Sequence, residues 1–302
     1  MRALYIVGPT GSGKSSLASD IAGKLGGEIV NGDAFQLYKD IEIVTASPSK
    51  DELAKAPHHL YGRLDLTEES NASKYSILAK DKIAKINANN KLAIVTGGSG
   101  LYIKSLTHGL SNLPASDPKV REELDQLPLE KLIEKLNVID PIGAQTINLK
   151  NKRYVIRALE ISLLGGKPMS EVKKEWKNKN PLFNGIIIDR SREELYNRIN
   201  SRVISMFKSG ATEEIRQLPD NISQTANKAI GIREIKEYLI GKITLEESIS
   251  TIQKSSRNYA KRQITWFKRE SGFQKVCLNV EDDRESERKK IITTINSMQN
   301  VN

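Results

Sequence analysis

The first thirty residues combine a strand-like run with a glycine-rich stretch of fixed spacing. Residues 4–7 form an apolar run typical of a buried strand, and residues 16–25 have the pattern of a helix that ends at two glycines. Between them, residues 8–15 match G-x-x-x-x-G-K-[ST]. In such a loop, backbone N–H groups converge on phosphate oxygens, and the helix presents its positive dipole end to the anion. The chain is therefore predicted to fold around a phosphate-binding loop (P-loop).

Two side chains of this motif add to the backbone groups. Lys14 supplies a mobile cation, and the Ser15 hydroxyl can hold Mg²⁺. The residues predicted to bind phosphate are Gly8, Pro9, Thr10, Gly11, Ser12, Gly13, Lys14 and Ser15. The motif does not reveal which phosphate compound is bound.

Further strands and helices alternate after this loop. Residues 28–31 and 92–95 read as buried strands, and residues 75–87 between them have helical spacing. Such alternation is typical of an α/β fold with a parallel sheet. Residues 228–240 are predicted as one helix, and Cys277 as a packed small hydrophobic residue in a strand-like run.

The pattern changes in the middle of the chain. A proline-punctuated linker precedes a segment, residues 119–175, in which only helices are predicted. A buried strand then returns at residues 185–189. We therefore predict a P-loop NTPase-like α/β core of residues 1–111 and 181–302 with C-terminal helices, and a helical insertion domain of residues 112–180.

The predicted strand ends also carry polar residues. Asp33 follows the strand at residues 28–31, whereas the strand at residues 92–95 leads into Thr-Gly-Gly-Ser-Gly, without the acidic residue common at that place in P-loop hydrolases. Because the carboxyl ends of parallel strands flank the ligand crevice, Asp33, Ser99 and the P-loop are expected to converge. An Asp there can bind a metal or act as a general base, and a simple turn-forming role is the alternative.

Positive charge is concentrated in two windows. The chain has 47 Lys and Arg against 37 Asp and Glu, a net charge of +10. Residues 152–180 hold eight Lys or Arg and three Glu, and residues 254–275 hold seven Lys or Arg and one Glu. Clustered charge of this kind favours a polyanion such as nucleic acid, although solvated helix faces would also account for it.

The composition excludes several other classes of protein. No apolar run approaches the roughly 18–20 residues of a membrane helix, so no membrane association is predicted. One Cys and three His leave too few ligands for a disulfide framework or an ordinary zinc site. A cytoplasmic protein is the expectation.

Eight stretches, in order along the chain, resemble the tRNA dimethylallyltransferase family. They are residues 8–15, 33–38 (DAFQLY), 45–48 (TASP), 57–60 (PHHL), 97–102 (GGSGLY), 157–160 (RALE), 229–231 (AIG) and 259–267 (YAKRQITWF). The P-loop alone is generic, whereas the last stretch together with GGSGLY is specific to this family.

The resemblance implies roles for individual residues. Asp33 would be the base for the exocyclic amine of the target adenosine, with Lys14 and Ser99 as further catalytic residues. Arg202, the second Arg of Arg-Ile-x-x-Arg, would bind the diphosphate together with the P-loop. The residues implied to contact tRNA are Asp33, Ala34, Phe35, Gln36, Ser99, Arg121, Arg153, Arg157 and Arg262.

The resemblance also implies an activity. A dimethylallyl group would pass from dimethylallyl diphosphate to the adenosine at tRNA position 37, next to the anticodon, with Mg²⁺ as cofactor and the anticodon stem-loop as partner. The chain would act as a monomer. It departs from the family pattern at Ala34, commonly Ser, at Ser99, commonly Thr, and at Tyr154, commonly Arg.

Three other functions share part of this sequence pattern. A P-loop nucleoside or metabolite kinase would use the same phosphate site but needs no basic surface. A prenyltransferase acting on free adenylate would need no helical insertion. A non-catalytic RNA-binding module would bind RNA without turnover.

Overall fold

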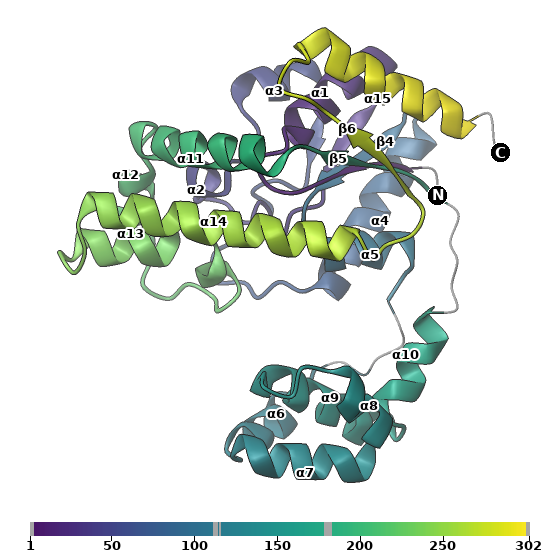
Figure 1. Cartoon of the computed structure of the whole chain (residues 1–302), viewed down its shortest axis with the longest axis vertical. Coiled ribbons are helices and arrows are strands. Elements are labelled where there is room, and N and C mark those ends of the chain that lie inside the picture. The colour runs from purple at the N-terminus through teal and green to yellow at the C-terminus, as the bar shows by residue number, and fades with distance from the viewer. Residues whose placement is uncertain (1–2, 111–113, 115, 178–182, 300–302) are drawn as a thin grey trace. The chain divides into compact units, whose positions relative to one another are not determined.

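The computed structural model describes residues 3–110, 114, 116–177 and 183–299 of the chain. The chain forms two compact units (Figure 1): unit 1 comprises Met1–Thr107 and Leu182–Asn302, and unit 2 comprises His108–Pro181.

Unit 1 is built on a six-stranded sheet in the order β3-β2-β4-β1-β5-β6. The strands are β1 (Ala3–Val7), β2 (Glu28–Asn31), β3 (His58–His59), β4 (Ala93–Gly97), β5 (Asn184–Asp189) and β6 (Phe273–Cys277). Every neighbouring pair is parallel, which confirms the predicted α/β class. The carboxyl ends of β2, β4, β1 and β5 therefore meet along one edge, where polar loops can surround a ligand.

Helices cover both faces of this sheet (Figure 1). Those of unit 1 are α1 (Lys14–Leu25), α2 (Glu42–Thr45), α3 (Lys50–Lys55), α4 (Ala72–Ala88), α5 (Gly100–Thr107), α11 (Arg192–Lys208), α12 (Ala211–Arg216), the 3-10 turn η1 (Ala226–Lys228), α13 (Ile232–Leu239), α14 (Leu245–Phe267) and α15 (Arg284–Gln299). Alternate strand residues such as Leu4 and Ile6 pack with Leu17 and Ile21 of α1 and with Ile291 of α15 in one core cluster. This core fixes α1, and with it the P-loop, over the sheet.

Helix α4 packs against the sheet and holds the carboxyl end of β2 through Tyr75. Its Tyr75 is fully buried, stacks on Tyr102 of α5 with ring centroids 4.5 Å apart, and donates a hydrogen bond to the carbonyl of Asn31 at 2.8 Å. A buried phenol normally needs such a partner. The bond holds in place the backbone that leads directly into Asp33.

Three sequence predictions differ from the structure. The helix predicted at residues 228–240 is interrupted, because Gly231 has φ 112°, and α13 starts after it. Cys277 is exposed, not packed. It lies in edge strand β6, where Val276 points into the core and its neighbours, by the alternation of a strand, do not. The sequence after Pro57 also favours a short strand that includes Leu60, but β3 ends at His59 and Leu60 has φ 65°.

Unit 2 is entirely helical in its described part. Its helices are α6 (Pro118–Asp125), α7 (Leu129–Ile139), α8 (Pro141–Thr146), α9 (Lys152–Gly165) and α10 (Met169–Lys177). They enclose a core of their own, which includes Leu132, Leu136, Val155 and Leu159. The buried carboxylate of Asp140 caps α8 by accepting the N–H of Gly143 at 2.8 Å, and α8 is a helix that the sequence pattern does not predict.

Candidate active site

The P-loop is held from outside by three side chains that come from distant parts of the chain. Arg190 donates from Nε to the carbonyl of Ser12 at 2.8 Å, and Arg198 donates from Nε to the carbonyl of Gly11 at 2.8 Å. The Oε1 atom of Gln263 accepts the N–H of Thr10 at 2.8 Å. These contacts fix the loop backbone without a ligand. The first N–H groups of α1 have no partner within the helix, so they are available to an anion.

Lys14 and Arg202 bring positive charge to the loop. Burial lowers the pKa of Lys14 to about 8, while the charge of Asp33 opposes the shift and that of Arg202 adds to it. Burial also lowers the pKa of Arg202, again opposed by Asp33. Neither cation has an ion pair among the residues that the structure describes, and Nε of Arg202 is buried without a hydrogen-bond partner. An anion bound here would supply the missing partner.

Asp33 is fixed by the residues around it. Its N–H donates to Oδ1 of Asn31 at 2.8 Å, and the amide group of Asn31 donates to the carbonyls of Asp33 and Leu60, each at 3.0 Å. The N–H of Phe35 donates to Oδ1 of Asp33 at 3.1 Å. Asn31 is fully buried at the end of β2, so this turn is rigid and the Asp33 carboxylate has a defined direction.

The Gly-Gly-Ser-Gly loop after β4 lies against α14 and the Asp33 turn. Ser99 accepts the N–H of Ala34 on its hydroxyl at 2.9 Å, and so joins the two strand ends. A Cβ on Gly98 would lie 2.1 Å from Nε2 of Gln263, and one on Gly100 would lie 2.3 Å from the ring of Trp266. The glycines are therefore required by the close approach of α14.

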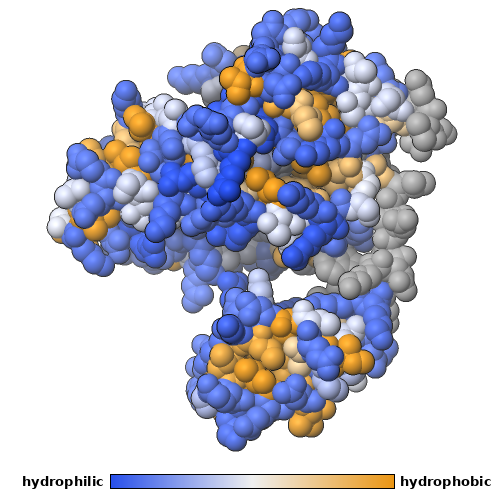
Figure 2. Space-filling model, in the orientation of Figure 1, coloured by the Kyte–Doolittle hydropathy of each residue, from blue (hydrophilic) through white to orange (hydrophobic). Residues whose placement is uncertain are grey.

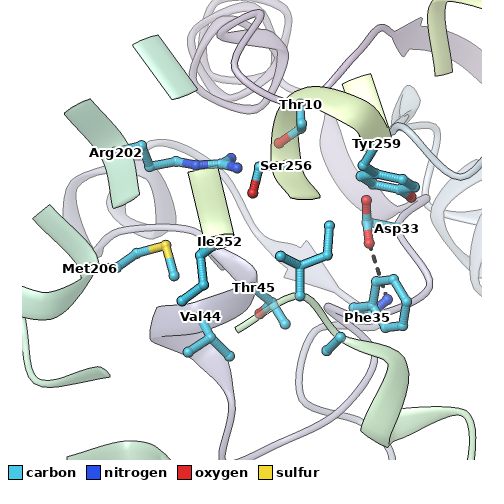
Figure 3. Close-up of a pocket in the computed structure, with 12 residues that line it drawn as sticks. Thr10, Asp33, Phe35, Val44, Thr45, Arg202, Met206, Ile252, Ser256 and Tyr259 are labelled. Atoms are coloured by element: carbon cyan, nitrogen blue, oxygen red, sulfur yellow. Dashed lines mark hydrogen bonds between the residues drawn. The ribbon is translucent and has the colours of Figure 1, made fainter. Parts of the chain in front are cut away.

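Asp33, Arg202 and the P-loop residue Thr10 line one cavity (Figure 3). It holds about 490 Å³ of empty space, part of it open to solvent, and its lining residues are Thr10, Asp33, Phe35, Val44, Thr45, Arg202, Met206, Ala229, Ile230, Ile252, Ser256 and Tyr259. Thr10, Asp33 and Arg202 are its polar groups near the P-loop, and Val44, Met206 and Ile252 give it an apolar wall (Figure 3). The cavity can accept a molecule with an anionic end and a short hydrocarbon chain.

Four of the predicted site residues of unit 1 line the cavity, namely Thr10, Asp33, Phe35 and Arg202. Of the residues expected from the convergence of strand ends, Asp33 is in this lining and Ser99 is not. Gln36 instead uses its amide on the backbone, donating to the carbonyls of Thr45 at 3.1 Å and of Ala46 at 2.8 Å. It shapes the loop that forms one wall.

Arg262 lies on the exposed side of α14, next to the cavity-lining residue Tyr259. Its guanidinium is 5.5 Å from the centroid of the Tyr259 ring, within cation–π distance. Burial raises the pKa of the Tyr259 hydroxyl, and the negative charge of Asp33 adds to the shift. Tyr259 therefore stays neutral and can present its ring to a planar group in the cavity (Figure 3).

Within unit 2, two predicted arginines share one buried carboxylate. Arg121 and Arg157 donate to Oε2 of Glu160 at 2.8 and 2.7 Å, and both guanidinium groups remain partly exposed. Arg153 and Tyr154 are exposed on the same helix, α9. Unit 2 thus presents cationic groups, two of them held in fixed directions.

The residues present are compatible with one Mg²⁺ beside the P-loop. No cluster of three or more His, Cys, Asp or Glu suited to a metal occurs in the described part of the chain. Mg²⁺ does not need one, because it commonly uses one or two protein ligands together with substrate phosphates and water. Ser15, at the start of α1, is partly exposed and offers one hydroxyl ligand.

Several residues at this site carried no predicted role. Arg190 directly follows β5, so the rule that strand ends meet at the crevice could have singled it out. Arg198, Gln263 and Tyr259 lie on helices remote from the P-loop in sequence, and no local pattern indicates their contacts.

None of the helices in the described part of the chain has the length and apolar character needed to span a membrane.

Comparison with known proteins identifies the family. The family model described as IPP transferase matches residues 36–270. The chain is 40% identical over 276 residues to tRNA dimethylallyltransferase 1 of Citrifermentans bemidjiense, and the match covers 90% of each chain. It is also 40% identical over 279 residues to the tRNA dimethylallyltransferase of Akkermansia muciniphila, where the match covers 92% of this chain and 94% of the relative.

Solved structures agree with this match. The full-length tRNA isopentenylpyrophosphate transferase of Bacillus halodurans superposes with a TM-score of 0.71 at 32% identity, covering 99% of this chain and 98% of that one. A eukaryotic dimethylallyltransferase acting on tRNA gives a TM-score of 0.83 at 27% identity, covering 99% of this chain and 80% of that one. The chain therefore belongs to the IPP transferase family, together with the tRNA dimethylallyltransferases that it matches over nearly its whole length.

Proposed function

We propose that this chain is a tRNA dimethylallyltransferase. It transfers the dimethylallyl group of dimethylallyl diphosphate to the exocyclic amine of the adenosine at tRNA position 37, next to the anticodon, and releases diphosphate. The observation that carries the proposal is the single cavity in which Arg202 and the P-loop residue Thr10 lie beside Asp33 and an apolar wall. Arg202 and the P-loop can bind an anion, Asp33 can act as a base, and the apolar wall can hold a short hydrocarbon chain.

The donor is bound by its two unlike ends. The diphosphate occupies the P-loop, where the N–H groups at the start of α1, Lys14 and Arg202 offset its charge. The dimethylallyl group lies along the apolar wall of Val44, Met206 and Ile252. When the carbon–oxygen bond breaks, negative charge grows on the departing oxygen, and donors already in position stabilise it. Removal of one such donor typically costs about 2.7–4 kcal/mol of barrier.

Asp33 completes the bond exchange. The amine nitrogen forms a bond to the prenyl carbon, the bond from that carbon to the diphosphate oxygen breaks, and the amine proton passes to the Asp33 carboxylate. The hydrogen bond from Phe35 and the buried Asn31 hold this carboxylate in its direction. General-base help of this kind contributes roughly 10²–10⁴-fold. Mg²⁺, bound by the Ser15 hydroxyl and the diphosphate, would supply further charge neutralisation.

The acceptor must be an RNA base that can leave its stack. Flipping costs a few kcal/mol in a duplex and less in a loop, which favours an anticodon loop as substrate. Tyr259 offers a neutral ring beside Asp33 for the adenine, and Arg262, Arg121 and Arg153 offer charge for the backbone. We infer that the chain acts as a monomer in the cytoplasm, where tRNA is available.

The test is a transfer assay with labelled dimethylallyl diphosphate. Unmodified tRNA, an anticodon stem-loop and AMP are compared as acceptors at equal concentration, with Mg²⁺ or with EDTA. The proposal expects label in tRNA and in the stem-loop, little in AMP, and a loss of rate in EDTA. Comparable rates with AMP and tRNA would instead indicate a free-adenylate prenyltransferase, and phosphoryl transfer from ATP to a small acceptor would indicate a kinase.

A further inference from the structure

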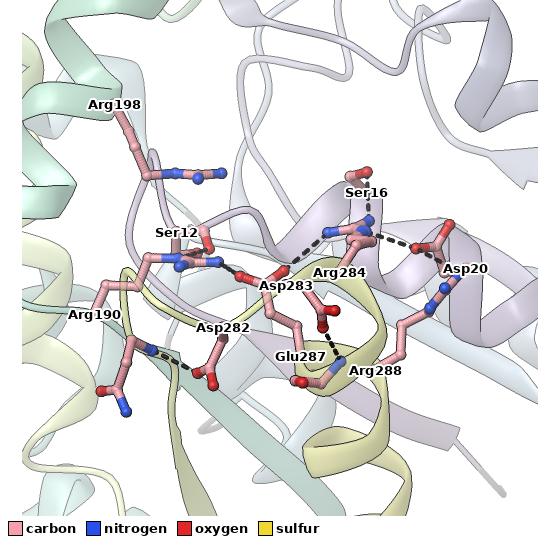
Figure 4. A network of polar contacts seen from close by, with 12 residues as sticks. Ser12, Ser16, Asp20, Arg190, Arg198, Asp282, Asp283, Arg284, Glu287 and Arg288 are labelled. Carbon is pink, nitrogen blue, oxygen red and sulfur yellow. Dashed lines mark hydrogen bonds and ion pairs between the residues drawn. The ribbon is translucent and has the colours of Figure 1, made fainter.

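The C-terminal helix α15 is tied to the P-loop by a polar network (Figure 4). Its later residues, among them Ile291 and Ile295, pack in the same core cluster as Leu17 and Ile21 of α1. Its first turn carries charged side chains that face α1 and the loop (Figure 4). The helix therefore does not only cover the sheet, because its charged first turn contacts the side chains that hold the P-loop.

Arg190 is the centre of this network. Its side chain is only 2% exposed, and each of its nitrogens has a defined partner. Nε donates to the carbonyl of Ser12 at 2.8 Å, one terminal nitrogen pairs with Glu194 at 2.5 Å, and the other pairs with Glu287 of α15. A buried guanidinium with two carboxylates is oriented by both, so loss of either one frees it to move.

Glu287 connects Arg190 with α1. Its Oε1 atom pairs with Arg190, and its Oε2 atom accepts from Arg284 at 3.3 Å. Arg284 also pairs with Asp20 at 2.8 Å and donates to the hydroxyl of Ser16 at 2.6 Å. The same turn of α15 thus holds the loop through Arg190 and the first turns of α1 through Arg284.

The direction of the Ser12 carbonyl determines where the next N–H points. In a trans peptide the C=O and the following N–H point in opposite directions. Because Arg190 holds the Ser12 carbonyl from the outer side of the loop, the N–H of Gly13 is turned toward the inner side, where a phosphate oxygen would accept it.

We propose that Glu287 is a positioning residue for the diphosphate site and acts through Arg190, so that the C-terminal helix sets the affinity for the prenyl donor. The inference rests on the proposed function, because it takes the P-loop ligand to be a diphosphate. Glu287 itself does not touch the substrate. Its effect is confined to the loop, whereas tRNA contacts depend on other residues.

The test replaces Glu287 by Gln and by Asp, with Glu285→Gln as matched control. Glu285 lies about half a turn away on the same helix, is exposed, and has Arg288 as its one ion-pair partner among the described residues. Dissociation constants are measured by calorimetry for inorganic pyrophosphate, dimethylallyl diphosphate and an anticodon stem-loop. For Glu287→Gln we expect both diphosphates to bind about tenfold more weakly and the stem-loop to bind as in the wild type. Glu287→Asp should recover part of the loss, and the control should show none.

A second measurement covers the case in which Glu287→Gln does not fold. Coupling is reciprocal, so saturating pyrophosphate should slow hydrogen exchange of the α15 amides in the unaltered protein. Unchanged exchange there, or a folded Glu287→Gln variant with wild-type diphosphate affinity, would overturn the inference, and so would an equal loss of stem-loop affinity. A wild-type protein that binds neither diphosphate would instead refute the proposed function.

Discussion

Gln263 joins two loops of the candidate site, so its replacement should change both the stability of the protein and the binding of the donor. It lies on α14, is 4% exposed, accepts the N–H of Thr10 at 2.8 Å and donates to the carbonyl of Gly98 at 2.9 Å. It therefore links the P-loop to the loop that carries Ser99. Leu at this position removes both bonds at nearly constant volume. Glu keeps the acceptor for Thr10 but places a second oxygen against the Gly98 carbonyl.

The expected magnitude follows from the two groups left behind. A buried donor or acceptor that loses its partner costs about 1–3 kcal/mol. Gln263→Leu leaves two such groups and should lower the free energy of unfolding by about 2–5 kcal/mol, with water access to the loops reducing the upper value. Gln263→Glu leaves one group and adds a repulsion, so we expect a loss of about 1–3 kcal/mol.

The loss of catalysis should exceed what the unfolded fraction explains. Thr10 lines the cavity, so release of its N–H should shift the loop and raise KM for the donor. Stability is measured by urea unfolding and catalysis by single-turnover transfer to tRNA. The control is Gln253→Leu on the same helix, which removes one bond, at 3.2 Å, to the carbonyl of Asn200 and not to the P-loop. The reasoning is refuted if Gln263→Leu retains wild-type stability and donor KM, or if Gln253→Leu raises that KM equally.

Three further changes test the rest of the site. Lys14→Ala should abolish transfer and leave the dissociation constant for tRNA nearly unchanged, and an equal loss of both would place Lys14 on the RNA instead. Asp33→Asn should slow single-turnover transfer by roughly 10²-fold or more with both substrates still bound, and near-wild-type rates would remove Asp33 from the role of base. Burial acts to raise the pKa of Glu160, but hydrogen bonds from Arg157 and Arg121 outweigh it, so its pKa is lowered in the folded state. The ionised carboxylate therefore stabilises the fold above its ordinary pKa of 4.5, and this stabilisation is lost as the pH falls through the lower pKa of the folded state. Glu160→Gln should reduce the difference in urea midpoint between neutral and acidic solution. An unchanged difference would contradict this.

The sequence predicts those parts of the site that follow from one contiguous motif or from the meeting of strand ends in a parallel sheet. The P-loop is a contiguous motif between a strand and a helix, and Asp33 and Ser99 follow strands whose carboxyl ends must meet in a parallel sheet. Arg202 was placed through the family resemblance, and it lines the cavity. The P-loop, Asp33 and Ser99 can be predicted from local chemistry and from one rule of sheet topology, whereas Arg202 needs the family resemblance.

The parts that the sequence does not predict depend on packing between remote segments. Glu287 lies in a strongly charged run, residues 281–290, yet it is buried against Arg190. The interruption at Gly231 and the exposure of Cys277 were missed for a related reason. Apolar periodicity continues across a glycine that needs a positive φ, and a strand-like pattern does not tell an edge strand from a central one.

Helix α14 shows how these levels combine. Ile252, Ser256, Tyr259, Gln263 and Trp266 recur at intervals of three and four residues, so they share one face of the helix. The first three line the cavity, Gln263 joins the P-loop to Gly98, and Trp266 packs where Gly100 has no side chain.

The basic residues of α14 occupy other faces of the same helix. Lys254, Lys261 and Arg262 are exposed, and Arg257 is partly exposed and donates to Asn200 at 2.6 Å. Positive charge on this helix is therefore presented to the outside, while its inner face lines the cavity. Under the proposed function, replacing an exposed cation should therefore change the salt dependence of RNA binding, whereas replacing Ile252 of the apolar wall should change the donor KM. The dense motif YAKRQITWF is then explained as two overlaid patterns on one helix, one for the cavity and one for the polyanion.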